Sequence, residues 1–187
     1  IQNAKSVNMP KDNIDRAIKK ASDKNLRDLK KIVFEGFGPF GIAIVIETAT
    51  ENNTRTVANI RSYFNKYSGN LGISGSVVYL FDHKCFFKIN VAGLNIEAFE
   101  LEFIDYGLEE IFSSDGHFFI YAPFESFGTI QAELESRNIE IKSSGFDRIP
   151  KITKNISQED SLVIEKLLSV IEKDEDVQHI YHDMGFN

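Results

Sequence analysis

The stretch from residue 84 to residue 146, KCFFKINVAGLNIEAFELEFIDYGLEEIFSSDGHFFIYAPFESFGTIQAELESRNIEIKSSGF, decides the fold of this chain. Apolar runs typical of strands alternate in it with segments whose apolar residues recur every three or four positions, as in an amphipathic helix. The sequence Ser114-Asp115-Gly116 is typical of a hairpin turn. The resulting order, strand-helix-strand-strand-helix-strand, is that of a ferredoxin-like domain. Strands are expected at about 84–91, 109–113, 117–122 and 139–146, and helices at about 96–106 and 124–136.

The residues on either side of this stretch predict a second α/β unit. Residues 42–48 are a β-branched apolar run that fits a central strand covered on both faces. The spacing of Val57, Ile60 and Phe64 predicts a helix, and Gly69 lies just past its end, where a left-handed cap is expected.

The C-terminal residues are expected to complete the same sheet. A helix opening at about residue 157 and a strand at 177–181 supply the missing elements. The triplet Asp82-His83-Lys84 is expected to connect strands at 76–81 and 85–91 as a hairpin. Insertions of this kind are tolerated because domain termini often lie close together.

The first thirty residues predict a helix that lacks partners. Pro10 suits a first helical turn, and Ile14, Ala17, Ile18 and Ala21 form one apolar stripe. A short amphipathic helix cannot bury such a stripe alone, so we expect further helices before it. The expected fold class is α+β, with two ferredoxin-like α/β domains, the second inserted in the first. The expected divisions are a remnant of a helical domain at 1–30, a discontinuous domain at 31–82 plus 152–187, and an inserted ferredoxin-like domain at 83–151.

Charge is unevenly distributed along the chain. The net charge is −7, yet residues 1–31 hold nine Lys and Arg against four Asp and Glu, whereas residues 83–187 are strongly acidic. A polyanion is therefore expected to meet the N-terminal end. The longest strongly apolar run, 42–46, is far shorter than the roughly 18 residues of a membrane span, so no membrane partner is expected. The single cysteine, Cys85, excludes an internal disulfide and fits a reducing, cytoplasmic location.

Several linked motifs resemble the YebC family. They occur in the family's order, densely over residues 8–83 and again near the C-terminus. The motifs are Asn8-Met9-Pro10-Lys11-Asp12-Asn13-Ile14-Asp15-Arg16-Ala17-Ile18, Phe34-Glu35-Gly36-Phe37-Gly38-Pro39, Asn53-Thr54-Arg55-Thr56-Val57, Gly69-Asn70-Leu71-Gly72, Gly75-Ser76-Val77 and Asp176-Val177-Gln178-His179-Ile180-Tyr181-His182.

The resemblance implies three domains, a missing basic N-terminal segment and a role in gene expression. The family is described as transcriptional regulators that bind DNA; its mitochondrial relatives are translational activators, and bacterial members have been linked to the ribosome. The implied partner is DNA or ribosomal RNA, and a ferredoxin-like module for a small ligand or another protein is the alternative. The expected nucleic-acid contacts are Lys11, Arg16, Lys19, Lys20, Thr54, Arg55, Arg61 and Lys66, with a second RNA contact at Arg148, Lys151 and Lys154.

The remaining candidate sites favour structural roles. Thr54, Arg55 and Thr56 at a helix start suit either a phosphate or simple capping, with Arg55 in solvent or paired to Glu51. The glycine-spaced loop at 69–75 lacks the lysine of a P-loop.

Catalytic and metal sites are not expected. Strand alternation places His179 and His182 on opposite faces, and Cys85 reads as a buried apolar residue. Phe64, Phe86 and Phe118 fall at core spacing. Exposed aromatic residues on a sheet could stack bases, but the strands lack the clustered basic and aromatic residues of RNA-binding sheets. We therefore expect no catalytic residues, no metal and no cofactor.

Overall fold

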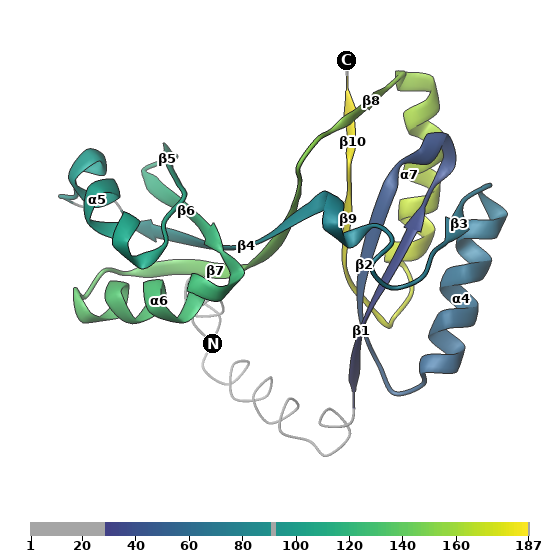
Figure 1. Ribbon diagram of the computed structural model, residues 1–187, viewed down its shortest axis with the longest axis horizontal. Helices are drawn as coiled ribbons and strands as arrows, with labels where there is room; N and C mark the ends of the chain where they lie inside the picture. The colour runs from purple at the N-terminus through teal and green to yellow at the C-terminus, as the bar shows by residue number, and fades with distance from the viewer. Residues whose placement is uncertain (1–28, 91–92, 187) are drawn as a thin grey trace. The chain divides into compact units, whose positions relative to one another are not determined.

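The computed structural model describes residues 29–90 and 93–186 (Figure 1). The described chain divides into two compact units. Residues 83–149 form one unit, and residues 29–82 with 150–186 form the other. The α+β fold class expected from the sequence is confirmed, with two antiparallel four-stranded sheets and helices against each. The helix expected after Pro10 lies outside the described residues.

In the unit formed by 29–82 and 150–186, strands from both ends of the chain share one sheet. Its order is β3-β1-β2-β9, so a C-terminal strand pairs with β2 of the N-terminal hairpin. Strands β8 and β10 form a separate parallel pair. The elements are β1 (Lys30–Phe37), β2 (Ala43–Thr50), α4 (Asn53–Lys66), β3 (Asn70–Leu71), β8 (Lys154–Ile156), α7 (Gln158–Glu172), β9 (Val177–His182) and β10 (Met184–Phe186).

Strand β2 is buried on both faces, as its β-branched run predicts. Ile44 and Ile46 face α4 and α7, where they pack with Phe64 and Leu167. Alternate residues of the same strand, including Val45, face the other way, toward the segment that follows β3. Both helices therefore lie on one side of this sheet, as Figure 1 shows.

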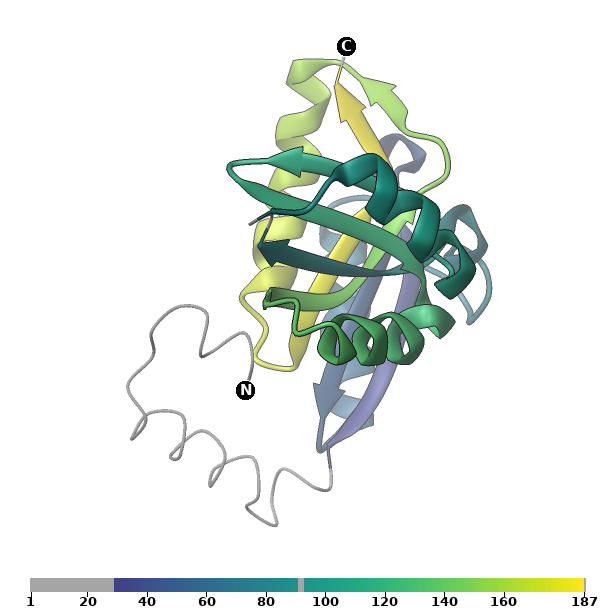
Figure 2. The ribbon, with the colours of Figure 1, turned by 90° about the vertical axis from the view of Figure 1, so that its left-hand side faces the viewer.

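The unit of residues 83–149 has the ferredoxin-like order. Its sheet runs β5-β6-β4-β7, with the hairpin β5–β6 placed beside β4. Helices α5 and α6 cover one side of it and share its apolar core (Figure 2). In the other unit β1 and β2, consecutive in the chain, take the two central places instead. The elements are β4 (Phe81–Asn90), α5 (Ile96–Phe103), β5 (Glu110–Ser114), β6 (His117–Pro123), α6 (Phe127–Ser136) and β7 (Ile141–Pro150).

The hairpin expected at residues 82–84 is wrong. Strand β4 runs without a break through this triplet, and residues 78–80 before it form a short 3₁₀ turn. Lys84 stays inside the strand because its ammonium lies 2.8 Å from the Glu110 carboxylate and 3.3 Å from that of Glu109. Lys84 thus has charged partners at the start of β5, on the far side of β6, and the chain does not need to turn there.

The core assignment of Phe86 is also wrong. Phe87 is fully buried under the helices, and strand alternation directs its neighbour Phe86 to the opposite face of the sheet, where it is half-buried. Two consecutive phenylalanines in a strand cannot both enter one core.

The left-handed residue after α4 is Ser68, with φ of 58°, not Gly69. Gly69 is required for another reason: a Cβ there would lie 2.9 Å from the Phe37 carbonyl oxygen and 2.9 Å from the Phe64 ring. The end of α4 therefore packs directly against the backbone of β1.

Candidate nucleic-acid interface

Helix α4 is the most basic described element of its unit. Its sequence, NTRTVANIRSYFNK, holds Arg55, Arg61 and Lys66 and no carboxylate, although the chain has 28 acidic residues. Asn52 caps the helix: its side-chain oxygen accepts a hydrogen bond from the Arg55 N–H at 3.1 Å. Buried Phe64 and its apolar neighbours fix the opposite side of α4 to the sheet, so the three cations remain exposed.

The three cations lie on two flanks of α4. Arg55 and Lys66 are eleven residues apart, about three helical turns, so they share one flank about 16 Å apart. Arg61 is six residues from Arg55 and lies on the other flank. The exposed residues between the flanks on the outward face, Thr54, Ala58, Ser62 and Asn65, are uncharged. This surface suits contacts to an extended polyanion rather than to one compact anion.

Arg55 is paired within the chain, with a partner that the sequence did not indicate. Its Nη2 lies 2.9 Å and 3.0 Å from the two carboxylate oxygens of Asp176, which is nearly buried. The Thr56 hydroxyl donates to the same carboxylate at 2.7 Å. Burial alone would raise the pKa of Asp176, but hydrogen bonds from Thr56 and Arg55 outweigh it and lower the pKa below its ordinary value.

This pairing favours the capping interpretation of the helix start. A carboxylate of the chain itself lies beside Arg55 and Thr56, where a phosphate was considered, and the ion-pair partner of Arg55 is Asp176 rather than Glu51. The Arg55 side chain still has 57% of its surface exposed. Thr54 is exposed and Thr56 is buried. The start of α4 is thus capped and charge-balanced.

The other residues expected to contact nucleic acid are dispersed. Lys11, Arg16, Lys19 and Lys20 lie outside the described residues. Arg148 is half-buried near the end of β7. Lys151 is exposed and its ammonium lies 3.6 Å from Asp82, while exposed Lys154 opens β8. Lys151 and Lys154 belong to the same unit as α4, and Arg148 belongs to the other unit.

A buried carboxylate, Glu35, escaped the sequence analysis. Its Oε1 accepts the Gly75 N–H, and its Oε2 accepts the N–H groups of Val77 and Val78, each at 2.7 Å. Glu35 is 4% exposed and therefore fixes the loop after β3 from inside the unit. The only sequence signal was an acid within the apolar strand that opens the motif Phe34–Pro39.

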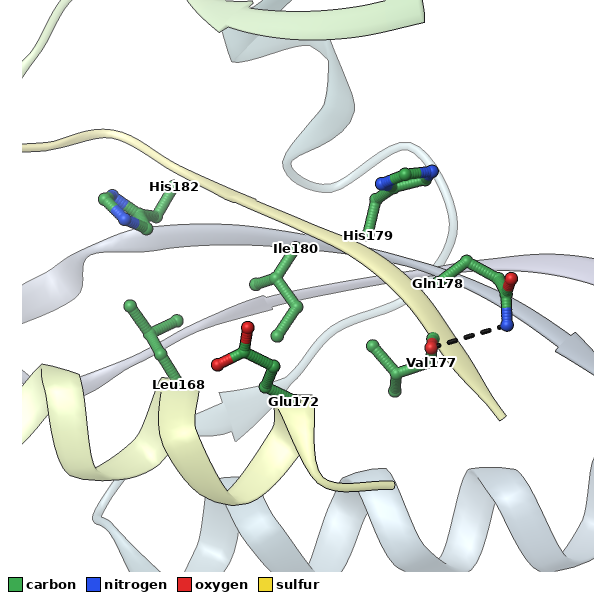
Figure 3. Close-up of a pocket in the computed structure, with 7 residues that line it drawn as sticks. All are labelled: Leu168, Glu172, Val177, Gln178, His179, Ile180 and His182. Atoms are coloured by element: carbon green, nitrogen blue, oxygen red, sulfur yellow. Dashed lines mark hydrogen bonds between the residues drawn. The ribbon is translucent and has the colours of Figure 1, made fainter. Parts of the chain in front are cut away.

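A polar pocket of about 360 Å³ lies between α7 and the edge strand β9 (Figure 3). Leu168 and Glu172 border it from α7, and Ile180 and His182 from β9. His179 lies beside Tyr181 on the other face of the strand, as alternation predicts. Burial lowers the pKa of His182.

The described residues offer little for metal or thiol chemistry. Among them, no three His, Cys, Asp or Glu side chains are grouped closely enough to hold a metal ion. Cys85 is fully buried as expected, its thiol donates to the Pro123 carbonyl at 3.3 Å, and burial raises its pKa to about 11. None of the helices in residues 29–90 and 93–186 combines the length and apolarity of a membrane span.

Comparison with known proteins places these features in a family. A family model described as the second and third domain of TACO1/YebC matches residues 29–184. Probable transcriptional regulatory proteins of Flavobacterium psychrophilum and Flavobacterium johnsoniae are 59% and 56% identical over 184 residues, covering 98% of this chain and 78% of each relative. The crystal structure of a conserved hypothetical protein from Aquifex aeolicus is 30% identical, with a TM-score of 0.74, over 99% of this chain and 77% of that one.

Proposed function

This chain belongs to the TACO1/YebC family, as its motifs indicated, and from that premise we propose that it is a gene-expression regulator that binds DNA and catalyses no reaction. The observation that carries the proposal is its similarity to probable transcriptional regulatory proteins, which align with 98% of the chain. The buried, high-pKa thiol of Cys85 supports a non-catalytic role for that residue, and its being the single cysteine fits action in the cytoplasm.

The geometry supports a contact through α4. Arg61 and Lys66 are exposed on a helix that itself holds no acid, so they can contact phosphates, whereas Asp176 already balances the charge of Arg55. Elsewhere in this unit, residues 152–187 carry eight acids against three bases. Contacts to phosphates position a protein on nucleic acid but carry no sequence information. The proposed interface therefore binds many sequences with similar affinity. Its proposed members are Lys11, Arg16, Lys19, Lys20, Thr54, Arg55, Arg61 and Lys66.

A second candidate function is that of a ribosome-associated translational activator that binds ribosomal RNA. Exposed Lys151 and Lys154 favour it, because they form a small basic island in an otherwise acidic part of the chain, with Arg148 just before them. Structured RNA presents phosphates and 2′-hydroxyls to such scattered cations. DNA remains the proposed partner, and the experiment below separates the two.

The test is a fluorescence-anisotropy titration of the whole chain against a duplex DNA and a ribosomal RNA helix of equal length. We expect measurable binding to DNA, weakened about equally on several DNA sequences by the double substitution Arg61→Gln and Lys66→Gln. Lys166→Gln, an exposed lysine on α7, is the matched control and should leave the affinity unchanged. Binding to the RNA helix with none to DNA would replace the first proposal by the second, and binding to neither would refute both.

A further inference from the structure

The side of the ferredoxin-like sheet not covered by helices carries aromatic residues where polar ones are expected. An antiparallel sheet with one face on a core normally presents polar side chains on the other. Here Phe112 and its neighbours occupy that second face, which we call the open sheet face. Its members are Phe86, Lys88, Phe112, Phe119 and Tyr121.

Strand register places these side chains in two adjacent rows. In one row Phe112 of β5 lies opposite Phe119 of β6, which lies opposite Lys88 of β4. In the next row Tyr121 lies opposite Phe86. The residues between them along each strand face α5 and α6 instead, as in the fully buried Phe87 and Ile120. The rows are therefore a product of strand alternation on three neighbouring strands.

The rings form a partly exposed group whose planes are nearly parallel. Phe112 and Phe119 are 5.3 Å apart with planes 9° from parallel, and Phe112 and Tyr121 are 6.2 Å apart with planes 15° from parallel. Phe112 is 46% exposed. On neighbouring β7, a Cβ at Gly145 would lie 2.9 Å from the Phe86 ring, so only glycine lets that ring lie across the strand.

Charge on the open sheet face is separated between its two ends. Lys88 lies with its ammonium 5.4 Å from the centre of the Phe119 ring, and within the described chain it has no ion-pair partner. Acidic groups gather at the other end, where Glu110 binds Lys84 at 2.8 Å and Asp147 lies near Tyr121. A ligand with flat rings and a negative group beside them fits the Lys88 end.

We infer that the open sheet face binds single-stranded RNA, with one or two unpaired bases stacked on Phe112, Phe119 and Tyr121 and a phosphate held by Lys88. Aromatic residues on a sheet stack unpaired bases in a sequence-tolerant way, and a nearby cation holds the backbone. Duplex DNA has no unpaired base to offer such a surface, whereas RNA loops do. The inference rests on the proposed function in taking nucleic acid as the partner, but it uses a different surface from α4.

The test measures binding of the whole chain to a fluorescein-labelled RNA of mixed sequence, about eight nucleotides long. Phe119→Leu keeps an apolar side chain but removes the stacking ring, and should weaken binding at least about five-fold. Lys88→Gln should weaken it and make the slope of log affinity against log salt shallower by about 0.7. Circular dichroism and the melting temperature establish that each variant is folded.

Two matched controls belong to the same unit. Phe124→Leu removes a ring that is 39% exposed and stacks on His83, and Lys142→Gln removes a cation paired with Glu140. Both should bind the RNA within two-fold of the unsubstituted chain. The same oligonucleotide as DNA should bind more weakly than the RNA.

The outcomes separate this inference from the proposal for α4. The inference is overturned if the chain binds duplex DNA but not the RNA oligonucleotide. It is also overturned if the Phe119→Leu and Lys88→Gln variants bind the oligonucleotide as tightly as the unsubstituted chain. Either result leaves the α4 proposal standing. The inference also fails if Phe124→Leu or Lys142→Gln lowers the affinity for the RNA as much as the open-face variants do. It fails equally if the DNA oligonucleotide binds as tightly as the RNA. Weakening in the two open-face variants alone supports it, even where duplex DNA does not bind.

Discussion

Replacing Glu35 by Gln is the sharpest structural test of how this family's glycine-rich loop is held. The carboxylate accepts three backbone N–H groups at 2.7 Å, two of them on Oε2. Glutamine keeps one oxygen, which can serve Val77 and Val78, but it turns an NH₂ group toward the Gly75 N–H. Two donors then face each other at a half-buried position.

The expected loss follows from these three hydrogen bonds. A hydrogen bond to a charged group contributes about 1.5–3 kcal/mol, and a neutral one about half as much. Losing the bond to Gly75 and weakening the two on Oε2 should cost about 3 kcal/mol in the free energy of unfolding. Because Gly75 is exposed and can bind water instead, the loss stays below the sum of three charged bonds.

Urea unfolding followed by circular dichroism measures this loss, and hydrogen exchange locates it. The amides of Gly75, Val77 and Val78 should exchange faster in Glu35→Gln. Glu165→Gln, at an exposed position of α7 in the same unit, removes the same charge and should change stability by less than about 0.5 kcal/mol. A Glu35→Gln protein as stable as the control, with these amides still protected, would refute the reasoning.

Three further predictions concern stability and reactivity. Because the folded-state pKa of Asp176 is lowered, its ionised form stabilises the fold. The free energy of unfolding should exceed that of Asp176→Asn by the full amount at pH 7, and this difference should shrink as pH falls through the lowered pKa. Urea titrations at several pH values measure it. Gly36→Ala should lower the melting temperature, since its Cβ would lie 2.7 Å from the Asn70 carbonyl oxygen, whereas Gly128→Ala, with nothing within 4 Å, should leave it unchanged or raise it. The buried thiol of Cys85 has a pKa of about 11, so at pH 8 it should react with a disulfide reagent only as fast as the protein opens. Comparing its reaction rate in the folded and the urea-unfolded protein measures this protection.

Local patterns in the sequence predicted the elements well. The apolar stripe of α4 and the β-branched run of β2 reflect burial on one side of a helix and both sides of a central strand, so each can be recognised within a few residues. The polar triplet before Cys85 misled because the partners that keep Lys84 in its strand, Glu109 and Glu110, lie 25 and 26 residues later, at the start of β5.

The contacts that define the candidate sites could not be predicted in the same way. Arg55 and Asp176 are 121 residues apart, and Glu35 and Gly75 are 40 apart, so no spacing rule joins them. The open sheet face depends on the register of three strands, which decides that Phe119 meets Lys88. Periodicity gives the face of a residue on its own strand, but cross-strand neighbours follow from the fold.

The measurement that tests the central claim most directly is the salt dependence of duplex DNA binding by the whole chain, compared with that of the Arg61→Gln, Lys66→Gln double variant. Each neutralised phosphate contributes about −0.9 to the slope of log affinity against log salt. If Arg61 and Lys66 both contact phosphates, the slope of the double variant should be shallower by about 1.8, with affinity reduced on every sequence. An unchanged slope with unchanged affinity would contradict the assignment of α4 as a nucleic-acid interface.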